Sequence, residues 1–362
     1  MNIPLFKIHW DEKDIEAVSE SLKKGMNWAC GPNIEKFEKR IEEYIGVKHA
    51  VVFNSGTSAL HALFIALEIG EGAEVIVPSF SFIATANAPL FVGAKPVFAD
   101  IDDVTYGLDV EDVRRKITDK TKAVMPMHYG GAVCGDIKKL KDLCQEKNIY
   151  LIEDAAESFG AKLGSGEAGT FGIAGMFSFC QTKVFTTGEG GCIVTNSDEI
   201  ADKLRLIGDH GRLGKEYVQL GYCWRMPDCI AALGISQLER VDDLIKIRRE
   251  KADYYRQQLA GVGDVSIPVF PEEMFHVYQE IHIRTKSRDA LKEFLADKGV
   301  GTRISFPPIH QSKYYKEVLG YDVSLPVTER VTSETLTLPL YPDLTQEEID
   351  YIVQSIKEFY AQ

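Results

Sequence analysis

This sequence of 362 residues contains no apolar run long enough to cross a membrane, which takes about 18 residues or more. We therefore expect no transmembrane helix and no membrane partner. The segment 1–14 lacks both the basic start and the apolar stretch of a signal peptide, so we expect none here. Positive charge is also short, because 41 Lys and Arg residues stand against 54 Asp and Glu residues and leave a formal net charge of −13. An acidic total argues against nucleic acid as the main partner.

Metal-binding and disulfide patterns are absent as well. The chain has seven cysteines, an odd number, and they form no C-x-x-C motif, while no histidine pair stands at zinc spacing. The cysteines are Cys30, Cys134, Cys144, Cys180, Cys192, Cys223 and Cys229. We therefore predict no metal site, reduced thiols and a cytoplasmic location. Free cysteines mostly behave as small buried apolar residues, and we expect the same of these seven.

Two familiar catalytic signatures are also missing, the G-x-S-x-G turn of hydrolases and the H-E-x-x-H helix of zinc peptidases. A G-x-G-x-x-G match does occur over Gly164–Gly169. A dinucleotide site, however, needs a strand before this motif and a helix that begins at its end. More glycines follow here, without a helical period. We predict a mobile glycine-rich loop at this position and no dinucleotide site.

What the sequence does contain is an alternation of short apolar strands with amphipathic helices. The predicted strands cover 50–53, 74–77, 96–99, 123–127, 150–152, 176–179 and 192–195. The predicted helices cover 11–24, 33–45, 59–68, 82–91, 110–117 and 137–147. Nearly continuous apolar strands separated by helices are typical of a mostly parallel sheet sandwiched by helices. We therefore predict the α/β fold class.

The last third of the chain has a different pattern. Two helices in series are predicted over 228–259, and an alternating strand over 277–284. Helices are predicted over 287–298 and 345–360, the second with an acidic start that suits the helix dipole. Because a chain of this length allows two domains, we predict a large domain over residues 1–240 and a smaller C-terminal α+β domain over residues 241–362.

The functional argument depends on Lys183. This lysine follows a predicted strand and precedes a glycine-rich turn, a place where catalytic groups often lie. A solvated surface lysine is the alternative. Apolar residues flank Lys183 on both sides, however, and burial among them would lower its pKa and leave a nucleophilic amine. Such an amine forms a Schiff base with an aldehyde, and pyridoxal 5′-phosphate (PLP) is the common aldehyde cofactor.

Three further features match what PLP requires. Asp154 ends a predicted buried strand and could hold the pyridinium proton, although a loop or helix-cap aspartate is the alternative. The segment 54–58 joins a strand to a helix and offers donors for the phosphate, although it would also serve as a plain N-cap. Phe80 and Phe82 follow the strand at 74–77, and we expect one to stack on the ring and the other to pack in the core.

The order of these motifs resembles that of the DegT/StrS family of PLP-dependent nucleotide-sugar aminotransferases, which have the type I aminotransferase fold. The matching stretches are Trp28–Pro32 with Phe37 and Glu38, Ser55–Leu60, Pro78–Asn87, Gly93–Val97, Glu153–Ala156, Phe177–Phe179 with Lys183 and Gly188–Gly191, and Gly221–Tyr222 with Arg225 and Met226. The resemblance covers nearly the whole chain. It implies transfer of an amino group from an amino acid, L-glutamate by analogy, to the keto group of a nucleotide-linked deoxysugar at C4 or C3. It also implies a homodimer whose second subunit completes each active site.

The resemblance implies roles for individual residues. Lys183 would form the internal aldimine and move a proton, and Asp154 would pair with the pyridinium nitrogen. Phe82 would stack on the ring, with Phe80 as second choice. The other cofactor-binding residues that it implies are Gly56, Thr57, Ser58, Glu157, Ser178 and Cys223.

Two positions depart from the family pattern. Glu157 stands where the family usually has glutamine, near the phenolic oxygen of the cofactor. Because a carboxylate repels a phenolate, we expect Glu157 either to be protonated or to point elsewhere. Cys223 stands where the family usually has an asparagine that reaches the phosphate of the partner subunit. A thiol is a weak donor, so this contact is in doubt.

Substrate contacts are predicted less specifically, and the candidates are Trp28, Gly31, Arg225 and His310. A lone histidine such as His310, His128 or His210 is more often a structural residue than a catalytic one. Rival functions stay open: a PLP-dependent sugar dehydratase, a transaminase of a non-sugar ketone, or a non-catalytic regulatory relative. Some relatives that dehydrate sugars carry histidine in place of the lysine, so Lys183 argues against the first rival.

Overall fold

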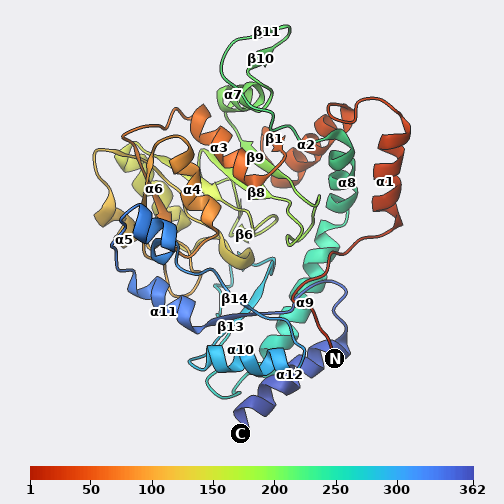
Figure 1. Ribbon diagram of the computed structural model, residues 1–362, viewed down its shortest axis with the longest axis vertical. Helices are drawn as coiled ribbons and strands as arrows, with labels where there is room; N and C mark the ends of the chain where they lie inside the picture. Colours follow the sequence, from red (N-terminus) through yellow and green to blue (C-terminus); the bar gives the residue numbers. More distant parts are fainter.

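Seven strands form the central sheet of the computed structural model, which describes residues 1–362 (Figure 1). In spatial order they are β1 (His49–Phe53), β9 (Gly191–Thr195), β8 (Ala174–Ser178), β5 (Tyr150–Asp154), β4 (Thr121–Val124), β2 (Glu74–Pro78) and β3 (Lys95–Ala99). The neighbouring strands from β8 to β3 pair in parallel, whereas β9 runs against both of its neighbours. The prediction of a mostly parallel sheet is confirmed.

Helices cover both faces of this sheet, as predicted. One face packs against α3 (Gly56–Ala66), α4 (Ile83–Phe91) and α7 (Asp198–Gly208). The other face packs against α2 (Pro32–Ile45), α5 (Val110–Lys116), α6 (Ile137–Lys147) and α8 (Asp228–Leu238). Helix α1 (Glu12–Lys23) lies outside α8 (Figure 1). Each strand alternates between the two layers: on β5, Leu151 joins one apolar cluster and Ile152 the other.

A second, three-stranded sheet lies at the end of the molecule where both chain termini are found (Figure 1). Its strands, in spatial order, are β13 (Ile281–Arg284), β15 (Thr335–Leu338) and β14 (Arg303–Ile304). A separate apolar cluster joins this sheet to α9 (Val241–Leu259), α10 (Arg288–Asp297) and α12 (Gln346–Tyr360). The cluster includes Ile3, while Ile309 and Leu325 pack with the central sheet. The domain boundary at residue 240 stays a prediction.

Several elements differ from the sequence prediction. The strand predicted over 277–284 covers only β13, because Tyr278 has a positive φ of 48° that breaks the extended backbone. Helix α11 (Pro326–Glu334) and the α7, β14 and β15 segments were not predicted. Short helical turns also lie at η1 (Tyr129–Gly131), η2 (Ile309–Gln311) and η3 (Tyr314–Val318).

The Gly164–Gly169 segment forms the turn and second strand of a hairpin, which the prediction of a glycine-rich loop did not include. Strands β6 (Lys162–Leu163) and β7 (Gly166–Glu167) pair in antiparallel fashion, and β12 (Met274–Phe275) pairs with β6. Glycine suits the turn because Gly164 has a φ of 63°. A second hairpin, β10 (Arg212–Leu213) and β11 (Glu216–Tyr217), projects from the opposite end of the molecule (Figure 1).

Candidate active site

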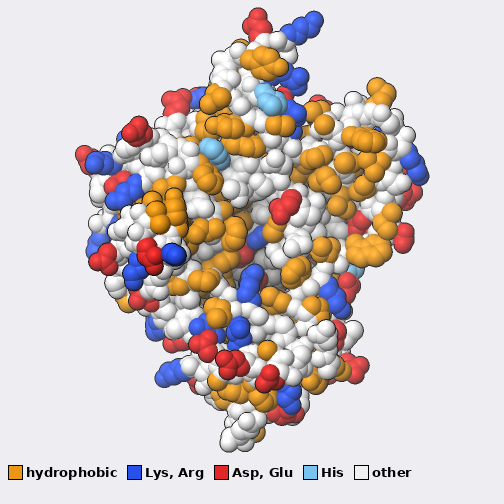
Figure 2. All heavy atoms as spheres, in the orientation of Figure 1, with side chains coloured by type: hydrophobic (Ala, Val, Ile, Leu, Met, Phe, Trp, Pro, Cys, Tyr) orange, Lys and Arg blue, Asp and Glu red, His pale blue; other side chains and the backbone are white.

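A cavity of about 380 Å³ lies between the central sheet and the C-terminal sheet. Its walls come from the carboxyl ends of β2, β5 and β8, from the N-terminus of α3, and from the segments around β13 and β14. Parallel strands present their carboxyl ends at one edge of a sheet, which is where α/β proteins commonly bind ligands. In Figure 2 the molecule is hollowed near its centre, and charged side chains of both signs meet there among apolar ones.

Lys183 lies in this cavity, with most of its side chain buried. Its Nζ donates a hydrogen bond to Oε1 of Glu157 at 3.3 Å. Burial alone would lower the pKa of Lys183, but the charges of Glu157, Cys180 and Glu280 outweigh burial and raise it. The predicted lowering of the Lys183 pKa is therefore wrong, because the lysine faces carboxylates that its flanking apolar residues in the sequence could not reveal.

Asp154 ends β5 and is fully buried at the cavity wall. Oδ2 accepts a hydrogen bond from the Thr85 hydroxyl at 2.6 Å, and Oδ1 accepts one from the Ala156 N–H at 3.2 Å. Burial raises the pKa of Asp154, and the two hydrogen bonds together with the charge of Lys183 offset only part of the increase. No cation contacts the carboxylate directly, so the site places a buried acid without an ion pair at the wall of a cavity.

Glu157 points into the cavity and contacts a cation. Its Oε2 accepts a hydrogen bond from the backbone N–H of Gly130 at 2.9 Å, while Oε1 faces Lys183. The side chain is 3 % exposed. Both oxygens of the carboxylate thus accept a hydrogen bond.

The N-terminus of α3 forms a further part of the wall. Gly56 and Thr57 line the cavity together with Ser178 at the end of β8. A Cβ at Gly56 would lie 3.0 Å from Sδ of Met176, so the helix approaches β8 as closely as a glycine permits. The Ser58 hydroxyl instead donates to Oδ1 of Asn54 at 2.6 Å within the turn and does not line the cavity.

The two candidate aromatic rings have different environments. Phe82 lines the cavity and is 57 % exposed, whereas Phe80 is completely buried. Phe80 packs edge-on against Tyr106, and its ring centroid lies 4.7 Å from that of Tyr129. Phe82 can therefore contact a ligand in the cavity, whereas Phe80 is part of the core.

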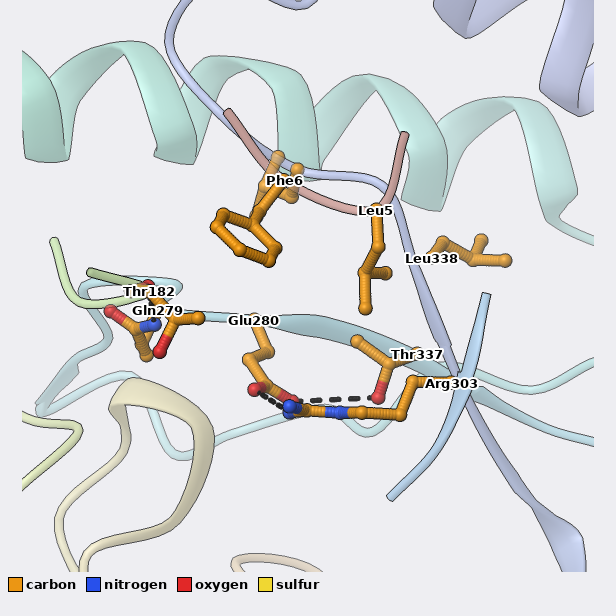
Figure 3. Close-up of a pocket in the computed structure, with 9 residues that line it drawn as sticks. Leu5, Phe6, Thr182, Gln279, Glu280, Arg303, Thr337 and Leu338 are labelled. Atoms are coloured by element: carbon orange, nitrogen blue, oxygen red, sulfur yellow. Dashed lines mark hydrogen bonds and ion pairs between the residues drawn. The ribbon is translucent and has the colours of Figure 1, made fainter. Parts of the chain in front are cut away.

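Sequence reasoning missed a second ion pair, Glu280 with Arg303 (Figure 3). Glu280 also accepts a hydrogen bond from the Thr337 hydroxyl at 3.4 Å. The pair lines both the main cavity and a small cavity of about 30 Å³ below Leu5 and Phe6. Neither member stands in a motif, and β14 has only two residues, so no local pattern marks them.

Besides Ser58, five predicted site residues lie outside this cavity. Trp28 and Cys223 are exposed, and Arg225 pairs with Asp209. Gly31 precedes α2, where a Cβ would lie 2.6 Å from the Asp228 carboxyl group. His310 is held by two side chains: its Nδ1 lies 2.6 Å from the Ser79 hydroxyl, and its Nε2 lies 3.3 Å from Oε1 of Glu329. Burial lowers the pKa of His310. Their predicted ligand contacts stay predictions.

The sequence led us to expect seven buried cysteines, but the structure does not bury all of them. Cys134, Cys144 and Cys192 are buried, and Cys180 and Cys229 are partly buried. Cys30 and Cys223, the other two, are exposed. No helix of the structure combines the length and apolarity needed to cross a membrane.

Comparison with known proteins gives consistent matches over the full chain. The family described as the DegT/DnrJ/EryC1/StrS aminotransferase family matches residues 9–357. GDP-perosamine synthase of Escherichia coli O157:H7 is 38 % identical over 365 residues, which cover 99 % of each chain.

Solved structures agree with this match. The aminotransferase TlmJ from Streptoalloteichus hindustanus superposes with a TM-score of 0.94 at 32 % identity, over 99 % of each chain. DesV from S. venezuelae, solved in complex with a ketimine intermediate, superposes with a TM-score of 0.95 at 29 % identity, over 100 % of this chain and 99 % of the other. The predicted type I aminotransferase fold is confirmed.

Proposed function

Because this chain belongs to the DegT/DnrJ/EryC1/StrS aminotransferase family, we propose that it transfers an amino group from L-glutamate to the keto group of a nucleotide-linked deoxysugar, with PLP as cofactor. One observation carries the proposal. The amine of Lys183 shares a cavity with the buried carboxylate of Asp154 and with the N-terminus of α3. A nucleophilic amine, a buried acid and a helix N-terminus are the groups that PLP chemistry requires of a protein.

The residues of the cavity fit PLP. Asp154 is buried without a cation in direct contact, a costly arrangement that a protonated pyridine nitrogen would relieve. The backbone N–H groups at the start of α3 and the Ser178 hydroxyl offer donors for a phosphate, and the helix dipole favours its charge. The exposed face of Phe82 offers a flat apolar surface for the ring.

When bound, PLP supplies an electron sink for the carbon that gains or loses the amino group. The residues of this chain do the rest. Asp154 would keep the ring nitrogen protonated, and Gly56, Thr57 and Ser178 would hold the phosphate. Nζ of Lys183 would take a proton from the carbon that carries the amino group and return one on the other side of the transfer.

Arg303 is the residue we propose for the amino donor. Of the 18 residues that line the cavity, only Lys183 and Arg303 carry a positive charge, and Lys183 is committed to the cofactor. Nε of Arg303 is buried without a hydrogen-bond partner, and its guanidinium lies 5.8 Å from the centre of the Phe306 ring. The Arg303 side chain is 40 % exposed, and the N–H donors of a guanidinium suit the carboxylate of an amino acid.

The nucleotide-linked sugar requires more surface than this cavity offers, and we propose that a second copy of the chain supplies it. Trp28, Tyr217 and Leu220 are exposed apolar residues at the end of the molecule that carries the β10–β11 hairpin. Cys223 lies outside the cavity of its own subunit, as a residue that reaches a partner's site would. We therefore propose that the chain forms a homodimer in which each active site contains residues of both subunits. We also propose that this homodimer works in the cytoplasm.

The test is an amino-transfer assay with the purified full-length chain. We expect L-glutamate to be converted to 2-oxoglutarate, with a new amine on a nucleotide-linked keto-sugar identified by mass spectrometry. A GDP-linked keto-sugar is the first to try, because the 38 % identical relative is a GDP-perosamine synthase. Elimination of water from the sugar without net amino transfer would instead favour a dehydratase.

Lys183→Ala is the decisive variant, and Lys147→Ala, which removes an exposed lysine at the end of α6, is its matched control. We expect Lys183→Ala to lose both amino transfer and covalent attachment of PLP, detected as added mass after borohydride reduction. Lys147→Ala should keep both. Transfer at the wild-type rate by Lys183→Ala would refute the proposal.

A further inference from the structure

Lys183 and Glu157 form a buried ion pair at the wall of the cavity. Nζ of Lys183 lies 3.3 Å from Oε1 of Glu157, and the two side chains are 14 % and 3 % exposed. The Gly130 N–H, at 2.9 Å from Oε2, fixes the orientation of the carboxylate. An ion pair so far removed from water interacts more strongly than one at the surface.

Other charged groups also face Lys183, but each is occupied or more distant. They are Asp154 at the end of β5, Cys180 and Glu189 beyond β8, and Glu280 with Arg303 from the C-terminal sheet. Asp154 is held by Thr85 and Ala156, and Glu280 is paired with Arg303. Glu157 is therefore the carboxylate in direct contact with the amine.

We propose that Glu157 is the counter-ion of Lys183: it stabilises the ammonium form of the free lysine and so sets the pH above which the amine becomes a nucleophile and base. A glutamine would keep the shape of this side chain but would carry no charge. The proposal rests on the proposed function only in naming PLP as the aldehyde that reacts with Lys183.

Two opposing effects decide the charge of Lys183. Burial favours the neutral amine, and the facing carboxylates favour the ammonium; the pKa of Lys183 is raised, so the carboxylates prevail. Only the neutral amine attacks an aldehyde. When Lys183 later takes a proton from carbon, a C–H bond breaks, an N–H bond forms at Nζ, and Glu157 faces the resulting ammonium. Glu157 thus delays attack to higher pH and strengthens the lysine as a base.

The experiment measures the rate at which PLP attaches to the full-length chain after the cofactor has been removed. The reaction is run from about pH 6 to about pH 10, stopped with borohydride, and read as added mass on the peptide that contains residue 183. We expect the midpoint of the pH profile to fall by about one unit or more in Glu157→Gln, a tenfold change in acidity. In the matched control Glu280→Gln, whose carboxylate is paired with Arg303, we expect a smaller fall.

Glu157→Asp guards against a merely structural effect, because it keeps the charge and shortens the reach. We expect its midpoint to lie between those of the wild type and Glu157→Gln. A Glu157→Gln profile that keeps the wild-type midpoint while its plateau falls would show a structural role only and would overturn the proposal. A Glu280→Gln shift equal to that of Glu157→Gln would also overturn it, because the direct contact would then carry no special weight.

The outcome is separable from that of the proposed function, since neither glutamate nor a sugar is present. Failure of the wild type to attach PLP at Lys183 would refute both. Normal attachment with an unmoved midpoint in Glu157→Gln would refute only the counter-ion role. With L-glutamate added to the loaded enzyme, the acid limb of the single-turnover rate should move in the same direction as the attachment profile.

Discussion

Glu153 and Asp154 are consecutive carboxylates at the end of β5, yet the pleat of the strand turns them to opposite faces of the sheet. Behind the sheet, Glu153 accepts three hydrogen bonds. Its Oε1 accepts from the Gly172 N–H at 2.7 Å, and its Oε2 accepts from the Gly169 N–H and from His128 Nε2, both at 2.8 Å. In front, Asp154 faces the cavity with two neutral donors.

The geometry around His128 fixes its role. Its Nδ1 accepts a hydrogen bond from the Cys134 N–H at 3.0 Å, so Nε2 carries the proton that is donated to Glu153. The network ties the segments near residues 130 and 170 to the end of β5. His128 is therefore a structural residue, the more common outcome for a lone histidine in a sequence.

The difference between the two acids separates structural from functional burial. Glu153 is completely buried, does not line the cavity, and has both carboxylate oxygens bonded to donors of the protein itself. Asp154 is nearly as deeply buried, but it borders the cavity, accepts only two hydrogen bonds and has no ion pair. A buried acid that borders a cavity with fewer partners indicates a ligand site, whereas one enclosed by donors of the protein indicates a scaffold.

Asp154→Asn tests the functional side and should have the largest effect. An amide cannot hold the proton of a pyridinium ion, so we expect amino transfer to slow on the order of 100-fold or more, the size typical for loss of a preorganised electrostatic group. Single-turnover rates with L-glutamate measure this. A decrease of less than about threefold would contradict the role of Asp154, and with it the distinction between Asp154 as a functional acid and Glu153 as a structural one.

Glu153→Gln tests the structural side. The amide nitrogen would confront the N–H of Gly172 or those of Gly169 and His128, donor against donor. We expect the free energy of unfolding to fall by about 2 to 3 kcal/mol, as measured by urea denaturation. Amino transfer per folded molecule should change by less than about threefold; a loss as large as that of Asp154→Asn would erase the distinction between the two faces.

Arg303→Gln extends the comparison to the far wall of the cavity. We expect the KM for L-glutamate to rise about tenfold, equivalent to about 1.4 kcal/mol, because a partly exposed guanidinium is screened by water. The KM for the nucleotide-linked sugar should stay within about twofold. Arg330→Gln, which removes an arginine that pairs with Asp103 outside the cavity, is the matched control and should change neither constant.

Much of the site could be predicted because its residues lie at or just after the ends of strands of the central sheet. Gly56, Phe82, Asp154 and Lys183 each follow a strand that apolar pattern and length reveal, and the parallel topology brings the strand ends together. For the same reason the predicted sheet and its two helical layers match the structure. Local pattern and global fold agree in this part of the chain.

The C-terminal contribution could not be predicted in the same way. Arg303 lies on a strand of two residues, and Glu280 precedes a short one, so neither has a periodic pattern around it. They reach the cavity only through packing of the second sheet. The raised pKa of Lys183 escaped prediction for a related reason, because it depends on contacts with Glu157 and Glu280 that are set by the tertiary fold.

The smallest expected effect concerns stability rather than rate. Burial raises the pKa of Asp154 in the folded protein above its unfolded value. The folded state therefore binds more protons between these two values, so stability falls as pH rises through that window and the deficit is complete above the folded-state pKa. Without cofactor, the free energy of unfolding of Asp154→Asn should be about 1 kcal/mol higher than that of the wild type near pH 7, so the variant should be the more stable protein. This difference should shrink toward about pH 4.

Saturating PLP should reverse this order, because the wild type gains the pyridinium partner and the variant does not. Urea denaturation with and without PLP at the two pH values measures all four differences. Glu153→Gln, by contrast, should be less stable than the wild type in every condition, since its acceptors serve the protein and no ligand replaces them. A cofactor-free Asp154→Asn protein that is less stable than the wild type near pH 7 would mean that the protein already satisfies this carboxylate, and Asp154 would then belong with Glu153 in the scaffold.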